Sequence, residues 1–369
     1  MNSVHPFLSA TSTEDNWQSA ASDLLQQLGD IPAEMNVAFI YATSAFAMEL
    51  SRLLDELKQR TKINYWIGSI GTGICCTSRE IYDQAAVTLM LANFPQNNFS
   101  VFNGMENAPI FSKNTFGLNL AVIHADPRNG LVPEHIADLP DKMGNGYLVG
   151  GMTSSESHFY QVANDITEGD ISGIVFNDSN NIVTGITQGC TPIGEVHTLT
   201  SCDHHLAMSI DKRPALSVFK EEIGDILARD IDRAAGYIFA AFPVTGSDTG
   251  DYVVRNIIGI DPENNILAIG DNMKADSKIM FCKRDGQSAI QDMQRMLNNI
   301  KKRIGKNTIR GALYISCVGR GKNLFGENSE ELKMITETLG EIPLAGFYAN
   351  GEIAGNQLYG YTGVLTVFL

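Results

Sequence analysis

The sequence has 369 residues, of which 44% are apolar, so it can bury one large core or two of moderate size. Forty-two acidic residues against twenty-seven basic ones give a formal net charge of -15, which would repel nucleic-acid phosphates and anionic lipid and disfavours both as partners. No apolar stretch approaches the ~20 residues that cross a bilayer, and the start lacks a basic segment followed by an apolar one, so we expect a cytoplasmic protein.

The first element expected is an amphipathic helix. Thr11 and Glu14 have the spacing of a capping box and precede an apolar stripe that runs from Trp17 to Leu28 at three- and four-residue intervals. Residues 36–43, 46–59 and 64–70 then predict a buried strand, a helix and a second strand that ends in a glycine-rich corner. Together these segments predict one β-α-β unit.

The same pattern recurs twice further along the chain. Each recurrence has a continuous apolar strand, a crossover with a helix, and a returning strand marked by glycine, an arrangement typical of parallel strand pairs. The segments are 117–125, 135–139 and 146–154 for the second unit and 310–317, 330–339 and 343–352 for the third. We interpret the three units as a structural repeat.

Antiparallel strands are expected between the repeats. Asp-Ser-Asn-Asn at 178–181 and Pro-Glu-Asn-Asn at 262–265 stand between apolar runs, which indicates hairpin turns. The strands expected are 85–94, 99–105, 171–178, 181–189, 252–260, 264–269 and 277–283. Apolar positions from Ile290 to Ile304 predict a long helix packed on the last sheet. The expected fold class is α/β, with two α/β subdomains whose mixed sheets combine recurring β-α-β units and antiparallel hairpins.

The most distinctive local sequence surrounds Arg320. This residue lies between Gly319 and Gly321 directly after a buried strand, which delivers its guanidinium to the carboxyl edge of a sheet, where open α/β sheets bind ligands. Glu352 follows Gly351 on the returning strand. A guanidinium suits a carboxylate and a carboxylate suits an ammonium group, so the pair would fit an amino acid or a similar zwitterion. The alternative is that Arg320 and Glu352 pair with each other and only hold the fold together.

These residues also carry a family resemblance. CVGRG, LFG and AGFYANGE, at 317–321, 324–326 and 345–352, resemble the closing signature of the FIST C-terminal domain, and residues 242–261 with Arg255 resemble its earlier strand pair. The N-terminal half resembles the FIST N-terminal domain through WIGSIGTG at 66–73, LVGGMTSS at 148–155 and ITQGCTPIG at 186–194. The resemblance spans nearly the whole chain and predicts a FIST N-terminal domain at 1–200 and a FIST C-terminal domain at 201–369.

The resemblance implies a sensory module that binds a small molecule, amino acids among the proposed ligands, and relays the signal to a separate signalling protein. No catalytic signature is present, so we expect neither an enzyme nor a bound cofactor; an interaction adaptor is the second hypothesis. The ligand-binding candidates are Arg320, Glu352, Arg255, Gly319, Gly321, Gly351, Cys317 and Phe347.

Haem is the rival ligand, because some FIST relatives are described as haem proteins that respond to nitric oxide. A haem or metal site needs imidazole or thiolate ligands, and the candidates are His197, Cys202, His204 and His205. Their spacing is not that of a zinc finger, and Ser201 to Asp203 predict a turn, so surface histidines are the alternative interpretation.

Cysteine chemistry is the third hypothesis. Cys190, seven residues before His197, and Cys317, ahead of Arg320, could be drawn as activated thiolates, but a free cysteine is more often a small core residue. All six cysteines lack CxxC spacing, and we expect reduced thiols: Cys75, Cys76, Cys190, Cys202, Cys282 and Cys317. The segments at 71–73 and 151–155 have neither the lysine of a P-loop nor a full GxGxxG, so no nucleotide cofactor is expected.

Overall fold

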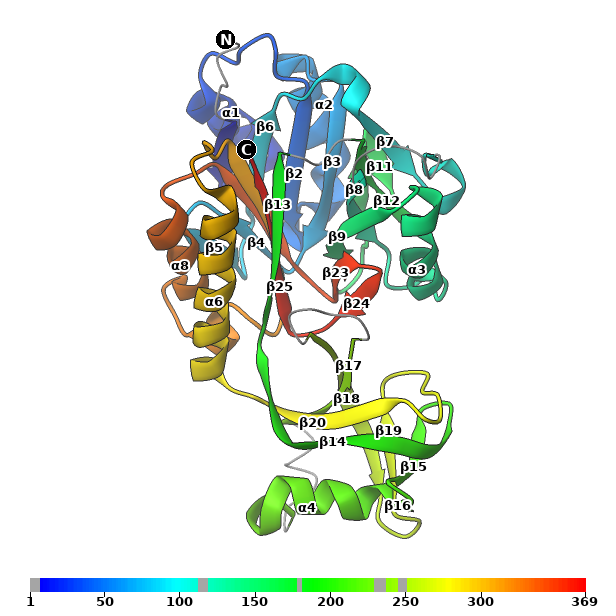
Figure 1. The fold of residues 1–369 in the computed structure, drawn as a ribbon. Helices are drawn as coiled ribbons and strands as arrows, with labels where there is room; N and C mark the ends of the chain where they lie inside the picture. Colours follow the sequence, from blue (N-terminus) through cyan, green and yellow to red (C-terminus); the bar gives the residue numbers. More distant parts are fainter. Residues whose placement is uncertain (1–6, 112–118, 178–180, 229–236, 245–250) are drawn as a thin grey trace. The chain divides into compact units, whose positions relative to one another are not determined.

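The chain is described by a computed structural model that covers residues 7–111, 119–177, 181–228, 237–244 and 251–369 (Figure 1). It divides into two compact units. The main unit comprises residues 1–187 and 290–369, and the inserted unit comprises residues 188–289 between them. The boundary predicted at residue 200 separates two domains defined by sequence resemblance. It is a different division from that into compact units, and it stays a prediction. No helix in the described ranges has the length and apolar character needed to cross a bilayer.

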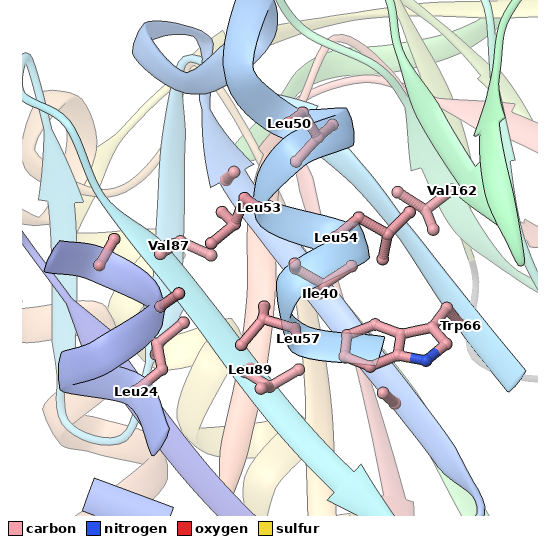
Figure 2. Packing of buried hydrophobic residues seen from close by; sticks show 14 of the residues in the cluster. Leu24, Ile40, Leu50, Leu53, Leu54, Leu57, Trp66, Val87, Leu89 and Val162 are labelled. Carbon is pink, nitrogen blue, oxygen red and sulfur yellow. The ribbon is translucent and has the colours of Figure 1, made fainter. Parts of the chain in front are cut away.

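The first β-α-β unit is present as predicted. β2 (Val37–Thr43) and β3 (Tyr65–Gly71) pair in parallel, joined by the 3-10 helix η1 (Ser44–Glu49) and α2 (Leu50–Thr61). Figure 2 shows how α2 packs its leucines against Ile40, Trp66 and the neighbouring strand β6 (Val87–Ala92). The buried face of α2 recurs at the helical interval through Leu50, Leu53, Leu54 and Leu57, which explains why this segment forms a helix that covers the sheet.

The second and third units repeat this arrangement, which confirms the predicted structural repeat. β8 (Asn119–Ala125) pairs in parallel with β9 (Gly146–Met152) across α3 (Val132–Lys142). β21 (Gly311–Cys317) pairs in parallel with β22 (Leu344–Ala349) across α7 (Lys322–Phe325) and α8 (Glu330–Leu339). The repeats share their register, since Gly68, Gly150 and Gly346 each face the same position of the preceding parallel strand.

Those three glycines are the ones that recur in the returning strands of the sequence, and the structure shows why they are needed. A Cβ atom would lie 1.7 Å from the carbonyl oxygen of Ile40 at Gly68, 1.9 Å from that of Ile123 at Gly150, and 1.7 Å from that of Tyr314 at Gly346. No real Cβ approaches a backbone oxygen so closely, so a side chain at these positions would push the parallel strands apart.

Each repeat lends a hairpin to the sheet of another repeat. β4 (Gly73–Cys76) and β5 (Arg79–Tyr82) follow β3 in the chain but extend the third sheet beside β22. β10 (Gln161–Ala163) and β11 (Asp165–Thr167) extend the first sheet beside β3. β23 (Glu352–Gly355) and β24 (Gln357–Tyr359) extend the second sheet beside β9. This exchange is cyclic, so no repeat is complete without the other two.

Three six-stranded sheets result, with the parallel pair at the centre of each. Their strand orders are β1-β6-β2-β3-β10-β11, β24-β23-β9-β8-β12-β7 and β13-β25-β21-β22-β4-β5. The remaining strands are β1 (Leu8–Ser12), β7 (Phe99–Asn103), β12 (Ile171–Phe176), β13 (Ile182–Gln188) and β25 (Thr362–Phe368). The short 3-10 helices η2 (Gln96–Asn98) and η3 (Met105–Asn107) flank β7. The mixed sheets confirm the expected α/β class.

Two local predictions in the main unit were wrong. Thr11 does not cap the first helix, because it lies in β1 paired with Thr88; α1 (Trp17–Leu28) is capped by Asn16, whose side chain accepts a hydrogen bond from the Ser19 N–H at 2.9 Å. The turn at 178–181, of which 178–180 lie outside the described residues, does not close a hairpin, since β12 and β13 belong to different sheets. Turn residues mark a reversal of the chain but do not specify which strands pair.

The long helix near the end of the chain is α6 (Gly286–Ile304), and it packs on the last sheet as predicted. Its Met293 sulfur lies 3.9 Å from the Tyr314 hydroxyl on β21, and Arg303 donates to the backbone oxygen of Thr184 on β13 at 2.6 Å. A Cβ atom at Gly185 of β13 would lie 2.8 Å from Ile300, so the helix approaches the strand closely there.

The inserted unit is a closed antiparallel barrel. The strands run in the order β14-β20-β17-β18-β19-β15, and a β14–β15 pairing closes the ring. Their bounds are β14 (Cys190–Asp203), β15 (Leu206–Ile210), β17 (Ile238–Pro243), β18 (Tyr252–Asp261), β19 (Ile266–Ile269) and β20 (Lys278–Arg284). The short β16 (Arg213–Pro214) and α4 (Ala215–Ala228) follow β15. Phe219 of α4 packs edge-on against Phe281 at 5.0 Å, so the helix shares the core of the barrel.

Candidate functional site

Arg320 lies at the carboxyl edge of the third repeat, between β21 and α7, as predicted, and its side chain is completely buried. Its Nε atom donates to Oε1 of Glu331 at 2.7 Å, and its Nη2 atom lies 2.7 Å from the same oxygen. Glu331 is in the first turn of α8 and is also fully buried. Arg320 therefore pairs with a carboxylate from its own crossover helix and not with Glu352.

Glu331 is the centre of a dense hydrogen-bond network. Its Oε1 atom accepts from the Tyr314 hydroxyl at 2.6 Å, and its Oε2 atom accepts from the Gly321 N–H at 3.0 Å and from the Ser316 hydroxyl at 3.2 Å. These donors, together with Arg320, replace the water that a buried carboxylate loses. Sequence reasoning missed Glu331, although it stands one turn before Ile335 on the buried face of α8, where an acidic residue is unexpected.

Thr362 holds one of the two carboxylate oxygens of Glu352. The Oε2 atom accepts from the backbone N–H of Thr362 at 3.0 Å and from the Thr362 hydroxyl at 2.8 Å. The Oε1 atom is buried and has no hydrogen-bond partner among the residues that the structure describes. Burial raises the pKa of Glu352 to about 7, while the bonds from Thr362, the charge of Arg320 and an interaction with the Cys317 thiol act in the opposite direction.

The peptide of Tyr361 and Thr362 brings Arg320 and Glu352 together. The Nη1 atom of Arg320 donates to the backbone oxygen of Tyr361 at 3.4 Å, and the next residue, Thr362, holds Glu352. Within the described ranges, Nη2 of Arg320 also has no hydrogen-bond acceptor in good geometry, despite its contact with Glu331. The site thus combines a buried donor and a buried acceptor that are both incompletely satisfied.

Cys317 lies beside this pair, at the end of β21. The Gly319 N–H donates to its sulfur at 3.5 Å, and burial, followed by the charge of Glu352, raises the pKa of the thiol. A thiol with a raised pKa is a poor nucleophile. All six cysteines lie in the described part of the chain and are free thiols.

Gly321 is required by its backbone conformation and by its surroundings. Its φ angle is +51°, and a Cβ atom there would lie 1.9 Å from the Tyr82 hydroxyl and 2.8 Å from the Tyr348 hydroxyl. Both hydroxyls donate to Glu80, which the borrowed β4–β5 hairpin brings from the first repeat. Burial raises the pKa of Glu80 to about 7. Sequence reasoning missed the contact of Glu80 with these hydroxyls, because the hairpin exchange leaves no local signal in the sequence.

The other predicted residues of the main unit have packing roles. The ring of Phe347 is fully buried and stacks on Tyr41 at 5.3 Å with an interplanar angle of 13°. A Cβ atom at Gly319 would lie 3.1 Å from the ring of Tyr361, and one at Gly351 would lie 2.7 Å from the methyl end of Met152. These residues shape the edge on which Arg320 and Glu352 lie.

Arg255 belongs to the inserted unit. It is on β18, where its Nε atom forms an ion pair with Asp271 at 3.0 Å. Burial, the larger effect, lowers the pKa of Arg255, and the charge of Asp271 opposes that shift. Its assignment as a ligand anchor stays a prediction.

The histidine and cysteine candidates for metal or haem are also in the inserted unit. The turn predicted at 201–203 was wrong, because β14 continues to Asp203 through a bulge. His197 lies between two carboxylates, with Nδ1 2.7 Å from Asp211 and Nε2 3.2 Å from Glu222. His204 is exposed and contacts Asp203. Across the described ranges, no group of three or more histidine, cysteine or acidic residues is arranged to hold a metal ion.

Known proteins resemble this chain over nearly its whole length. The FIST N domain model matches residues 36–213, and the FIST C domain model matches residues 215–355. An uncharacterized protein of Mycobacterium tuberculosis strain H37Rv is 26% identical over an alignment of 377 positions, which covers 95% of each chain. An uncharacterized protein of Mycobacterium bovis is 26% identical over an alignment of 377 positions, which covers 97% of each chain.

Proposed function

This chain belongs to the FIST family, whose domains are associated with signal-transduction sensors, and on that premise we propose that it senses a small ammonium-bearing molecule in the cytoplasm and relays its presence to a separate signalling protein. An amino acid or a similar zwitterion is the ligand class that suits the polar groups at the end of β21. Six free thiols are consistent with a reducing compartment.

The observation that supports this proposal is the buried Oε1 atom of Glu352, which lacks a hydrogen-bond donor in good geometry among the described residues. An acceptor buried without a donor costs about 1–3 kcal/mol, so a fold that retains one gains when a donor arrives. Thr362 holds the other oxygen, so Oε1 has the weak thiol donor of Cys317 as its neighbour and no strong donor among the described residues. A ligand ammonium would donate to Oε1 and add a charge attraction once Glu352 ionises.

Arg320 has a different part in the proposal. Because Glu331 already neutralises its charge, Arg320 contributes a directional donor, Nη2, and not an unpaired positive charge. A ligand carboxylate would accept from Nη2 while its ammonium faces Glu352. This arrangement would favour zwitterions over simple amines.

The burial of the site links ligand binding to movement. Arg320 and Glu352 are both 0% exposed, so a ligand reaches them only when the surrounding segments separate. The peptide of Tyr361 and Thr362 holds both side chains and would have to shift. A protein whose ligand selects such an opened or rearranged state can report binding to a partner.

The test is a thermal-shift screen of the twenty amino acids, ethanolamine and methylamine against the wild-type protein and Glu352→Gln. Glutamine keeps an oxygen for Thr362 but presents an amide, which cannot pair with an ammonium group. We expect at least one amino acid to stabilise the wild type, by ~2.7 kcal/mol at a hundredfold excess over Kd, and to lose this effect in the variant. No stabilisation by any compound, or equal stabilisation of both proteins, would contradict the proposal.

Haem stays the rival prediction. A visible absorption spectrum before and after addition of haem tests it directly, with His197→Ala as the paired variant. A sharp Soret band that this substitution abolishes would favour a haem-based gas sensor.

A further inference from the structure

The third repeat has an interrupted crossover, and the interruption follows directly after Arg320. In the first repeat η1 continues into α2 without a break, and in the second repeat a single helix, α3, makes the crossing. In the third repeat α7 ends at Phe325 and α8 begins only at Glu330. The segment from Gly321 to Gly326, which we call the strap, is therefore a separate piece of this crossover.

Both ends of the strap have a backbone conformation that favours glycine. Gly321 has φ +51° and ψ −135°, and Gly326 has φ +92° and ψ 177°. A Cβ atom at Gly326 would meet nothing within 4 Å, so conformation and not close packing explains this glycine. Beyond it, Asn328 and Ser329 also have positive φ angles. A few such residues at each end can absorb the dihedral changes of a hinge while the flanking elements stay in place.

The strap covers the guanidinium of Arg320. The Cζ atom of Arg320 lies 4.9 Å from the centroid of the Phe325 ring, and Phe325 is the buried residue of α7. Phe46 and Arg320 each stand six residues beyond the strand position that faces the returning glycine, and both are buried. An apolar residue therefore satisfies the fold at this place in the first repeat, whereas the third repeat buries a cation beneath a separate segment.

The other side of the strap is held by an ion pair at the surface. The Lys322 ammonium lies 2.5 Å from the carboxylate of Asp83, which follows β5, and 5.0 Å from the centroid of the Tyr82 ring. The Lys322 and Asp83 side chains are 35% and 80% exposed, so water and salt weaken their attraction. With one buried ring and one exposed ion pair, the strap should detach far more easily than β21 or α8 unfolds.

We propose that the strap opens as a unit about Gly321 and Gly326 and thereby uncovers the guanidinium of Arg320. Its part in ligand entry rests on the proposed function, because an opened strap would give an amino-acid carboxylate access to the Nη2 atom. The opening would also explain how a ligand reaches a residue that is 0% exposed. A ligand that binds one of the two strap positions more tightly would shift the population between them.

The experiment is modification of the full chain by phenylglyoxal, which reacts with guanidinium groups that solvent reaches, followed by peptide mass spectrometry. Arg60, whose side chain is 59% exposed, is the internal reference. Gly326→Ala disfavours the closed backbone without removing an atom that covers Arg320, and Lys322→Met releases the ion pair. The matched control is Gly340→Ala, because Gly340 has φ +92° and ψ 173° and equally open surroundings but ends α8, outside the strap.

We expect wild-type Arg320 to react slowly, at a rate that low urea concentrations leave unchanged, because local opening exposes little surface. Relative to Arg60, Gly326→Ala should raise this rate about fivefold or more, as the strain of alanine at this conformation predicts. Lys322→Met, a surface change that keeps the test available if Gly326→Ala folds poorly, should raise it about two- to fivefold. Gly340→Ala should leave the ratio unchanged.

Two results would overturn the strap. Equal acceleration by Gly326→Ala and Gly340→Ala would show that Arg320 reacts only after general unfolding, and no acceleration by either strap variant would show that the strap does not gate this residue. The thermal-shift screen reports separately on the ligand. Faster modification in Gly326→Ala without stabilisation by any amino acid would support the strap and contradict the sensor proposal. Ligand binding with unchanged modification rates would contradict the strap alone.

Discussion

Replacing Arg320 by methionine should destabilise the main unit far more than replacing an exposed arginine does. Arg320 and Glu331 are both 0% exposed, and the substitution leaves the Glu331 carboxylate buried with Tyr314, Ser316 and the Gly321 N–H as its donors. Removing one partner of a buried ion pair costs about 3–5 kcal/mol, because the other charge stays buried without its counter-ion. We therefore expect the free energy of unfolding to fall by about 3–5 kcal/mol.

Urea denaturation followed by tryptophan fluorescence measures this loss in the main unit, because both tryptophans, Trp17 and Trp66, belong to it. The matched control is Arg60→Met, since Arg60 pairs with Glu56 on the surface of α2 and should cost no more than about 0.5 kcal/mol.

A double variant completes the cycle. Arg320→Met combined with Glu331→Gln should lose less than the sum of the two single losses, because no uncompensated charge remains. A loss below about 1 kcal/mol for Arg320→Met, the scale of a surface pair, would refute the structural role given to this residue and make its guanidinium available to a ligand.

Three further substitutions test other parts of the account by the same urea method. Gly321→Ala should cost at least ~2 kcal/mol, because its φ of +51° is strained for alanine and its Cβ would lie 1.9 Å from the Tyr82 hydroxyl. Asn16→Ala should cost about 1 kcal/mol through loss of the helix cap on α1, and an unchanged midpoint would show that the cap is not needed. Burial raises the pKa of Glu352 from 4.5 to about 7, so the folded state favours the protonated carboxyl. The stabilisation of the folded state by protonated Glu352 is complete below pH 4.5 and is lost as the pH rises through 7. Over that interval the wild type should therefore lose up to about 3 kcal/mol of stability relative to Glu352→Gln. Parallel pH profiles of the two proteins would contradict the raised pKa.

The fold was predictable wherever a single segment carries its own periodic pattern. The three parallel strand pairs follow from apolar runs and returning glycines, since Gly68, Gly150 and Gly346 each mark a close approach of two strands. The exchange of hairpins was not predictable, because β4 and β5 have the same local pattern whether they pair with their own repeat or with β22. Strand partners depend on contacts distant in sequence, which alternation along one strand does not encode.

The candidate site shows the same limit. The glycines around Arg320 place its guanidinium at the carboxyl edge, and that placement holds. Its partner could not be identified from spacing, because Glu331 in the crossover helix and Glu352 after the returning strand are both possible carboxylates and only the three-dimensional packing decides which one Arg320 meets. Glu80 arrives from a different repeat altogether, so its proximity to Tyr348 requires the assembled fold.

Proton release on ligand binding tests the central claim most directly. The strongest amino acid from the thermal screen would be titrated calorimetrically at pH 7 in phosphate and in Tris, whose ionisation enthalpies differ, with the wild type and Glu352→Gln side by side. With a pKa of about 7, Glu352 is close to half protonated at that pH, and pairing with an ammonium group requires it to ionise. The account predicts that the wild type releases roughly half a proton per ligand and that the variant releases none. Heats that do not depend on the buffer, or equal release by both proteins, would contradict a ligand site at Glu352.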